Sequence, residues 1–302
     1  MAHTHSHSPA PKQGIKYGKA FLIGIILNIT FIIVEVIYGL AANSSALLAD
    51  AGHNASDVLS LFFAWGAAWI ALKQPSGKYT YGLRRTTILV SILNAIMLLI
   101  AVVFITMEAV EKIYNPVEIA GGTVMVVAGI GVIINGFTAL LFLKGRKDDL
   151  NIKGAFLHMA ADAGVSLGVV IAGLLIMMFN ILWIDPLMSF IIVGVIIYGT
   201  WGLLVDSLNL ALDAVPKDIN VEEVEKYLES VDGVEEVHDL HIWAMSTTQV
   251  ALTAHLVMPD GTPGSESNDI FIMNIRDELE KKFGISHSTL QIEKSPNECN
   301  CC

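Results

Sequence analysis

The sequence predicts an α-helical membrane protein with six transmembrane helices, followed by a smaller C-terminal domain of the α+β class. Hydrophobic residues make up 54% of the 302 residues and charged residues only 16%, against about 45–50% and about 25% in typical soluble domains. The charge is also divided, because the chain up to Leu212 has a net charge of +1 and the rest a net charge of −12. This pattern excludes a soluble globular protein, and the acidic C-terminal part excludes a nucleic-acid-binding module.

Six stretches of the chain satisfy the requirement for a membrane-spanning helix, about 20 mostly apolar residues. They are Tyr17–Leu40, Ala46–Leu72, Thr86–Ile113, Ile119–Leu143, Ile152–Phe179 and Ile184–Val205. The breaks between them carry turn or helix-start residues, such as Asn43-Ser44-Ser45 and Asp185-Pro186. We therefore place the transmembrane domain at residues 16–208. The polar leader 1–15, which contains histidines, is expected to be disordered and lacks the apolar core of a signal peptide.

Lysine and arginine are unevenly distributed between the two sides of this predicted bundle. The leader and the loops after the second and fourth helices hold eleven of them, whereas the opposite side holds only Lys112. Positively charged loops stay in the cytoplasm. Both termini are therefore predicted to be cytoplasmic, in a multi-pass protein of the lipid bilayer.

The C-terminal domain, residues 213–294, has the predicted order αββαβ. Asn220 can cap its first helix, which reaches about Val231, with Glu223 completing a capping box. The later elements are a hairpin of Val234–Met245 and Gln249–Met258, a helix at Ser267–Phe283 and a strand at Ser286–Glu293. This order favours a helix layer on an antiparallel sheet.

Two predicted membrane helices carry the same pattern, a histidine followed four residues later by an aspartate. The pairs are His53 with Asp57 in the second helix and His158 with Asp162 in the fifth. Residues four apart lie on one helix face, so facing helices would bring together two nitrogens and two oxygens, a set that suits tetrahedral Zn²⁺. Isolated polar residues bonded to neighbouring helices are the alternative. Charged groups in hydrocarbon usually mark a substrate or proton path, and two identical pairs favour a metal site.

Other polar residues in these helices allow two interpretations. Glu35, Asp50 and Asn135 could support the metal site, or they could simply form hydrogen bonds between packed helices, which is the preferred interpretation for Asp50. Glycines near the site would permit close approach of the helices: Gly52, Gly154, Gly164 and Gly168.

The segment Ser45–Asp57 (SALLADAGHNASD), the matching His158–Asp162 and the segment VHDLHIW at 237–243 resemble the cation diffusion facilitator family, in particular its zinc, cadmium and cobalt exporters. The resemblance covers the chain from the first helix to Glu293. It implies six transmembrane helices, a cytoplasmic αββαβ domain of metallochaperone-like, ferredoxin-like fold, and a homodimer. It also implies export of divalent metal in exchange for protons, with His53, Asp57, His158 and Asp162 as the transport site and no prosthetic group.

The ligand types favour Zn²⁺ as the main substrate. Imidazole suits zinc, cadmium and cobalt, whereas carboxylate-rich sites suit manganese and magnesium. Metal ligands must lose their protons, so protons and metal compete for the site. Many eukaryotic members of the family that this chain resembles carry a long, histidine-rich loop between the fourth and fifth helices. The corresponding loop here, Lys144–Lys153, is short and has no histidine. This difference favours a prokaryotic-type exporter in the plasma (cell inner) membrane.

A second metal site is predicted in the C-terminal domain. If the hairpin turns through Ser246-Thr247, His238 lies opposite His255, about 5 Å away, and period two puts His241 on the other face. Glu293 could complete the set, and the family's cytoplasmic site uses matching positions. Zn²⁺ would be the ligand here as well. Histidines on the surface of a sheet are the alternative.

Several further residues could capture metal or could be inert. They are His287, Cys299, Cys301 and Cys302 of the C-terminal tail 295–302, and the leader residues His3, His5 and His7.

Two other classes of protein compete with a transporter. An intramembrane metalloprotease needs a glutamate in an H-E-x-x-H pattern, which neither His53 nor His158 has, so the chain is not expected to be an enzyme. A passive metal channel or a membrane metal sensor stays open as an alternative.

Overall fold

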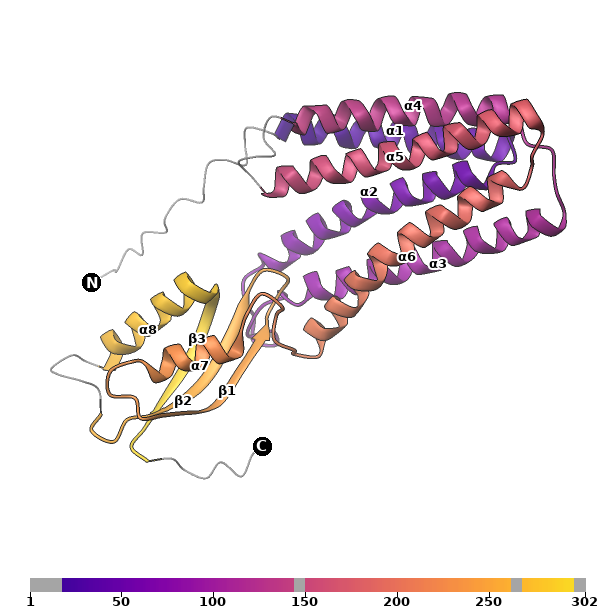
Figure 1. Ribbon diagram of the computed structural model, residues 1–302. Helices are drawn as coiled ribbons and strands as arrows, with labels where there is room; N and C mark the ends of the chain where they lie inside the picture. The colour runs from indigo at the N-terminus through magenta and orange to yellow at the C-terminus, as the bar shows by residue number, and fades with distance from the viewer. Residues whose placement is uncertain (1–17, 144–149, 262–267, 296–302) are drawn as a thin grey trace. The chain divides into compact units, whose positions relative to one another are not determined.

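The computed structural model describes residues 18–143, 150–261 and 268–295. Six long helices come first along the chain, followed by the order αββαβ (Figure 1). The helices of the first part are α1 (Gly18–Ala41), α2 (Ser45–Ala71), α3 (Thr86–Tyr114), α4 (Gly121–Phe142), α5 (Leu150–Phe179) and α6 (Ile184–Ala211). The later elements are α7 (Val221–Glu229), β1 (Glu236–Ala244), β2 (Val250–Val257), α8 (Asn268–Phe283) and β3 (Ile285–Glu293).

The predicted elements and their order are confirmed. Among the described residues, four helices are long and apolar enough to cross a membrane, within α3, α4, α5 and α6, and Ile25–Ala41 of α1 is a shorter apolar helix. The remaining long helix, α2, carries the polar residues Asp50, His53, Asn54 and Asp57. The protein is therefore a helical membrane protein with a small C-terminal α+β domain.

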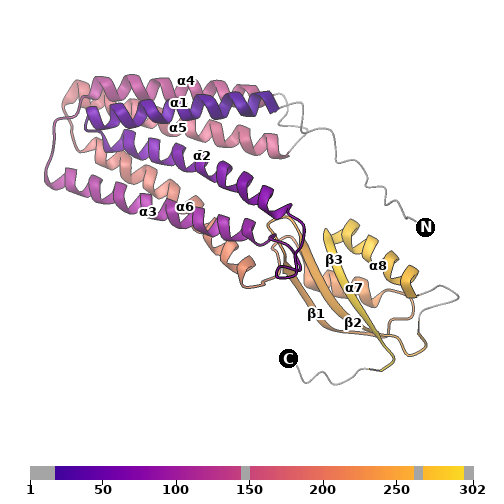
Figure 2. The same cartoon turned by 180° about the vertical axis from the view of Figure 1, so that it is seen from behind.

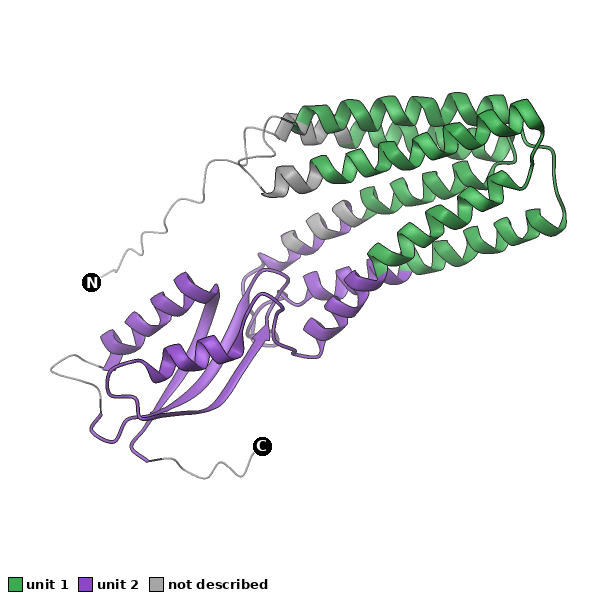
Figure 3. Cartoon of the chain, in the orientation of Figure 1, with its two compact units in different colours: residues 1–61, 97–200 green, residues 62–96, 201–302 purple. Residues whose placement is uncertain are grey.

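The chain forms two compact units, coloured separately in Figure 3. Residues 1–61 and 97–200 form the first unit, and residues 62–96 and 201–302 form the second. The division falls within α2, α3 and α6, whereas the boundary expected from composition lies after α6.

In the first unit, α1, α4 and α5 run side by side, as Figure 1 and Figure 2 agree. The α4–α5 contact is backbone against backbone at two glycines. A Cβ added at Gly173 would lie 2.7 Å from the Met125 nitrogen and 2.9 Å from the Gly121 oxygen. A Cβ at Gly164 would meet nothing within 4 Å, so the expectation of close helix approach at that glycine is wrong.

The start of α2 is held by a side chain of another helix. Asn43 ends α1 in the left-handed conformation (φ 49°), which asparagine tolerates. Ser44 then donates its hydroxyl to Asp185 of α6, which also accepts from the Ser45 nitrogen at 2.7 Å. Ser44, Ser45 and Asp185 are fully buried. A carboxylate at a helix N-terminus is favourable, so Asp185 fixes the turn from which α2 enters the bundle.

In the second unit, a three-stranded sheet of order β1-β2-β3 is covered by α7 and α8 on one face (Figure 2). Strands β1 and β2 are antiparallel, but β2 and β3 are parallel, so the expected antiparallel sheet is wrong. The physical reason is that α8 carries the chain back along the sheet before β3 begins, which makes β2-α8-β3 a crossover unit. The core between helices and sheet includes Leu228, Leu256 and Leu279. The cap of α7 is confirmed, since Asn220 Oδ1 accepts from the Glu222 nitrogen at 3.0 Å.

The hairpin pairs His238 with His255, as predicted, but for a different reason. The Met245 nitrogen donates to the Gln249 oxygen at 2.8 Å, so the turn contains three residues rather than the expected Ser246-Thr247. A β-bulge between His238 and His241 then shifts the register by one residue. The longer turn and the bulge compensate, and the two histidines still face each other.

Candidate metal centre

The two His–Asp pairs of α2 and α5 lie against each other in the first unit. His53 Nε2 lies 3.3 Å from Asp162 Oδ1, and His158 Nε2 lies 3.3 Å from Asp57 Oδ2. Within each helix the separations are longer, 3.9 Å for His53–Asp57 and 3.7 Å for His158–Asp162. Each histidine thus contacts both aspartates, which is the cross-connected arrangement that two antiparallel helices with an i, i+4 pair can form.

These separations suit one small ion. Zn–N and Zn–O bonds of about 2.0–2.1 Å in a tetrahedron place neighbouring ligand atoms about 3.3–3.4 Å apart. The two contacts between the helices already have this length. One ligand atom each of His53, Asp57 and Asp162 lies within 4.8 Å of the others. His158 is not part of that set, because its ring centre is 6.3 Å from that of His53. A small movement of His158 would complete the four ligands.

Exposure falls from one end of the cluster to the other. The His158 side chain is 43% exposed and Asp57 is 31% exposed, whereas His53 is 16% and Asp162 only 3% exposed. The accessible side of the cluster is therefore the His158–Asp57 side, toward the start of α5.

Glu35 and Asp50 lie beside this cluster, and both are fully buried. Asp50 accepts from Ser166 of α5 at 3.0 Å, and Glu35 accepts from Asn54 of α2 at 3.1 Å. The helix-packing hydrogen bonds expected for Asp50 are thus present. Asn135 is fully buried, and neither of its polar side-chain atoms has a hydrogen-bond partner among the described residues.

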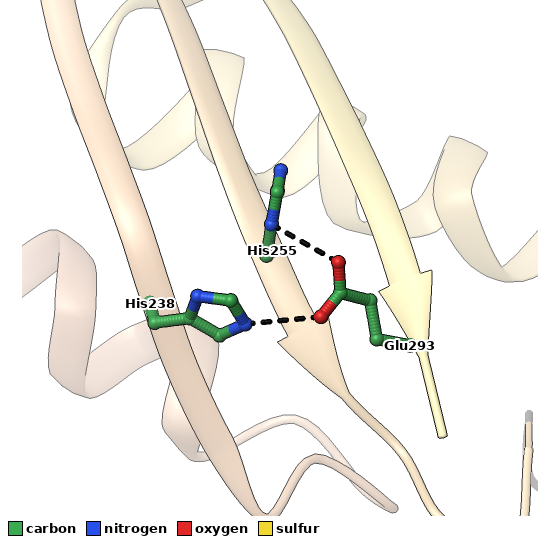
Figure 4. Close-up of side chains that lie close together, drawn as sticks. All are labelled: His238, His255 and Glu293. Carbon is green, nitrogen blue, oxygen red and sulfur yellow. Dashed lines mark hydrogen bonds and ion pairs between the residues drawn. The ribbon is translucent and has the colours of Figure 1, made fainter. Parts of the chain in front are cut away.

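A second cluster lies in the second unit, on the face of the sheet that α7 and α8 do not cover. His238, His255 and Glu293 come from the three adjacent strands and point toward one another (Figure 4). Glu293 Oε2 lies 3.2 Å from His238 Nε2, and Glu293 Oε1 lies 3.2 Å from His255 Nδ1. The three residues that we named from the sequence are therefore within the reach of a single ion.

Sequence reasoning missed one carboxylate at this second cluster. Asp239 adopts the left-handed conformation (φ 50°) at the bulge. Its carboxylate lies 3.6 Å from His255 Nε2 and 2.9 Å from His241 Nε2. Leu240 and Ile242 both pack in the domain core, so His241 between them faces the same side as His238, and its expected place on the other face is wrong. Nothing in the sequence pattern marks the bulge that causes this.

The remaining candidates are not gathered into either cluster. His287 is exposed on β3, with its ring 5.7 Å from that of Tyr81. Cys299, Cys301 and Cys302, and the leader histidines, lie outside the described residues.

Comparison with known proteins covers almost the whole chain. Residues 21–210 match the family model described as the cation efflux transmembrane domain. Residues 216–295 match the model described as the cytoplasmic domain of cation efflux proteins. The two matched regions meet between α6 and α7.

Among individual proteins, the chain is 34% identical to the "Cadmium, cobalt and zinc/H(+)-K(+) antiporter" of Bacillus subtilis, over 96% of this chain and 91% of that protein. It is 33% identical to the "Metal cation efflux system protein CzcD" of Cupriavidus metallidurans, over 98% and 91%. It is 31% identical to the "Zinc transporter ZitB" of Escherichia coli, over 98% and 94%. A solved C-terminal domain of a CzcD transporter matches 25% of this chain and 99% of its own at 33% identity, with a TM-score of 0.21.

Proposed function

Because the chain belongs to the cation diffusion facilitator family, whose members are transporters rather than enzymes, we propose that it exports Zn²⁺, together with Cd²⁺ and Co²⁺, by proton antiport. The proposed transport site consists of His53, Asp57, His158 and Asp162. The observation that carries the proposal is the pair of 3.3 Å contacts between α2 and α5. The named relatives support the choice of metals and the antiport.

The ligand set explains how protons would drive the metal. Two aspartates balance the charge of one Zn²⁺, and two imidazoles must be neutral to bind it. Protonation of the same groups removes the lone pairs that hold the ion. Histidine titrates near neutral pH, so a modest difference in pH between the two sides would favour metal binding on one side and release on the other.

The exposed side of the cluster agrees with loading from the cytoplasm. The positive-inside bias places the start of α5 and the end of α2 on the cytoplasmic side. His158 and Asp57, the more exposed ligands, lie toward these ends. In this proposal metal meets them first and then reaches His53 and Asp162. The protein would reside in the plasma (cell inner) membrane with both termini in the cytoplasm.

A passive channel or a metal sensor is the alternative, and one experiment separates them from an exporter. Purified protein in liposomes should accumulate zinc against its concentration gradient when a pH gradient is imposed. The accumulation should stop when a protonophore collapses that gradient. The Bacillus relative is also named for K⁺, so the flux is measured with and without a K⁺ gradient. If zinc only reached equal concentrations on the two sides, with the pH gradient and with the K⁺ gradient, the protein would not be an antiporter.

We also propose that His238, His255 and Glu293 bind a regulatory Zn²⁺ in the C-terminal domain, and that this domain pairs in a homodimer. The net charge of −12 from Asp213 onward would make two such domains repel each other unless a metal ion or the histidine-bearing face intervenes. Asp239, which lies 3.6 Å from His255, is a candidate fourth ligand.

Substituting His255 by alanine should remove this second ion and leave the four residues of the proposed transport site unchanged. In a chain that also carries Asp162→Ala, which disables the transport site, the His255→Ala change should lower the zinc bound per chain by one at equilibrium dialysis. His287→Ala is the matched control, because it removes an exposed histidine of the same domain. An unchanged zinc count in the His255 variant would contradict the second site.

A further inference from the structure

A buried pair of carboxyl groups lies next to the proposed transport site without belonging to it. The carboxyl pair consists of Glu35 of α1 and Asp50 of α2, each with 0% exposure. Asn54 Nδ2 donates to Glu35 Oε2 at 3.1 Å, and Ser166 Oγ donates to Asp50 Oδ2 at 3.0 Å. One oxygen of each carboxyl group is therefore satisfied by a neutral donor.

The other oxygen of each group has no such donor. Glu35 Oε1 and Asp50 Oδ1 are buried, and no N–H or O–H group in the described part of the chain donates to them. Asp50 and Asn54 are four residues apart and share one face of α2, and Asn54 bonds to Glu35, so the two carboxyl groups lie side by side against this face. Two adjacent carboxylates repel each other, and burial disfavours the ionised form of each, so the stable state of the pair holds a proton. A proton held between them turns one group into a donor and satisfies both oxygens.

Among the residues that the structure describes, no lysine or arginine forms an ion pair with either carboxyl group. Helix α4, which packs against α1, has no titratable side chain. From α2 and α5, the titratable groups nearest the carboxyl pair are His53 and Asp162, which contact each other. At the start of α2, Lys112 bonds to Glu108 at 2.7 Å. The other titratable group there, Asp185, accepts hydrogen bonds from Ser44 and Ser45.

The carboxyl pair lies one helical turn from the transport site. Side chains of α2 and α5 meet in antiparallel order over one stretch of each helix. Asp50 meets Ser166 at one level, and His53 meets Asp162 at the next. Between the levels the chain advances three residues on α2, which is about 4.5 Å along a helix. A proton can cover such a step through side-chain motion or a single water molecule.

We propose that Glu35 and Asp50 share one proton and form a proton-binding site that supplies the transport site. The inference rests on the function proposed above. After zinc leaves, the proton passes from the carboxyl pair to the His53 imidazole or the Asp162 carboxylate. The pair is then doubly negative until it takes up a proton from the membrane face nearest the α1–α2 turn. The positive-inside bias makes this the non-cytoplasmic face, where an exporter takes up its protons.

The test compares wild type with Glu35→Gln in proteoliposomes. Glutamine has the same shape and donates to Asp50 permanently, so it mimics the protonated pair. Zinc binding and exchange of zinc for labelled zinc at equal pH should stay within about threefold. Accumulation driven by a pH gradient should fall about tenfold, inside the 5–150-fold range typical of coupling between two sites. The number of protons exchanged per zinc ion should fall by one.

Two further measurements keep the proposal falsifiable. Asp50→Asn should reproduce the loss of coupling. Thr138→Val is the matched control, because the Thr138 hydroxyl donates to Ile134 O of its own helix at 2.8 Å. The infrared spectrum of the wild type is expected to contain the carbonyl band of a protonated carboxylic acid, and this band should disappear in both carboxyl variants. This band does not depend on transport, so it stays informative if the transport site is wrong.

Three results would overturn the proposal. The first is unchanged gradient-driven accumulation and proton count in Glu35→Gln. The second is a loss of zinc binding in that variant, which would make the pair a structural support of the metal ligands. The third is the absence of the carboxylic acid band from the wild type. Failure of the proposed function itself is recognised separately, since Asp162→Ala would then still transport.

Discussion

Replacing Asp162 by alanine is expected to abolish zinc transport while the chain still inserts into the membrane. Asp162 is the most buried of the four proposed ligands, and its two oxygens contact both His53 and His158. Without it, the site keeps one carboxylate to balance two positive charges. Loss of a group that only supports a ligand lowers metal affinity about 10–100-fold, so loss of the ligand itself should exceed about 100-fold.

The measurement is zinc uptake into everted membrane vesicles, with the amount of inserted protein determined by immunoblot. Asp57→Ala should give the same result. Thr138→Val removes a buried hydroxyl from the same bundle and should transport at the wild-type rate. If either aspartate variant accumulated zinc as fast as the parent, the assignment of the transport site would be wrong.

Replacing Gly173 by alanine is expected to destabilise the bundle strongly. The new Cβ would lie 2.7 Å from the Met125 nitrogen and 2.9 Å from the Gly121 oxygen. These are backbone atoms of α4, and they cannot rotate away as a side chain can. Helices α4 and α5 would have to separate, at a cost of about 1–3 kcal/mol for overpacking of this kind.

Gly164 on the same helix supplies the matched control. An added Cβ there meets nothing within 4 Å, and alanine in a helix is favoured over glycine by about 0.5–1 kcal/mol. Thermal unfolding of the detergent-solubilised chain, followed by size-exclusion chromatography, should show a lower midpoint for Gly173→Ala and an equal or higher one for Gly164→Ala. Equal midpoints for Gly173→Ala and wild type would contradict the close packing of α4 and α5.

The helices and strands could be predicted because each depends on local patterns. Apolar runs of spanning length and turn residues such as Asn43 set the limits of the long helices, and the αββαβ order followed from caps and periodicity. The direction of β3 was not predictable in this way. It depends on where α8 crosses the sheet, which is a property of the packed domain.

At the cluster of His238, His255 and Glu293, the predicted turn is wrong but the predicted pairing of the two histidines is confirmed. The sequence led to a two-residue turn, but the hairpin has a longer turn and a bulge at Asp239. The two differences cancel at His238 and His255. They do not cancel at His241, which the bulge turns to the face of His238 and within 2.9 Å of Asp239.

The sequence by itself determined the class of protein and indicated the residues proposed here for metal transport, because burying charged side chains in a membrane is costly and such residues usually have a functional role. The i, i+4 spacing determined that each pair shares one helix face. Only the tertiary structure decided which of these faces meet. The contacts of His53 with Asp162 and of Ser166 with Asp50 join helices that are distant in the chain, and the contact of Glu35 with Asn54 joins two consecutive helices. Their register depends on side-chain packing between helices, which no periodicity within one helix records.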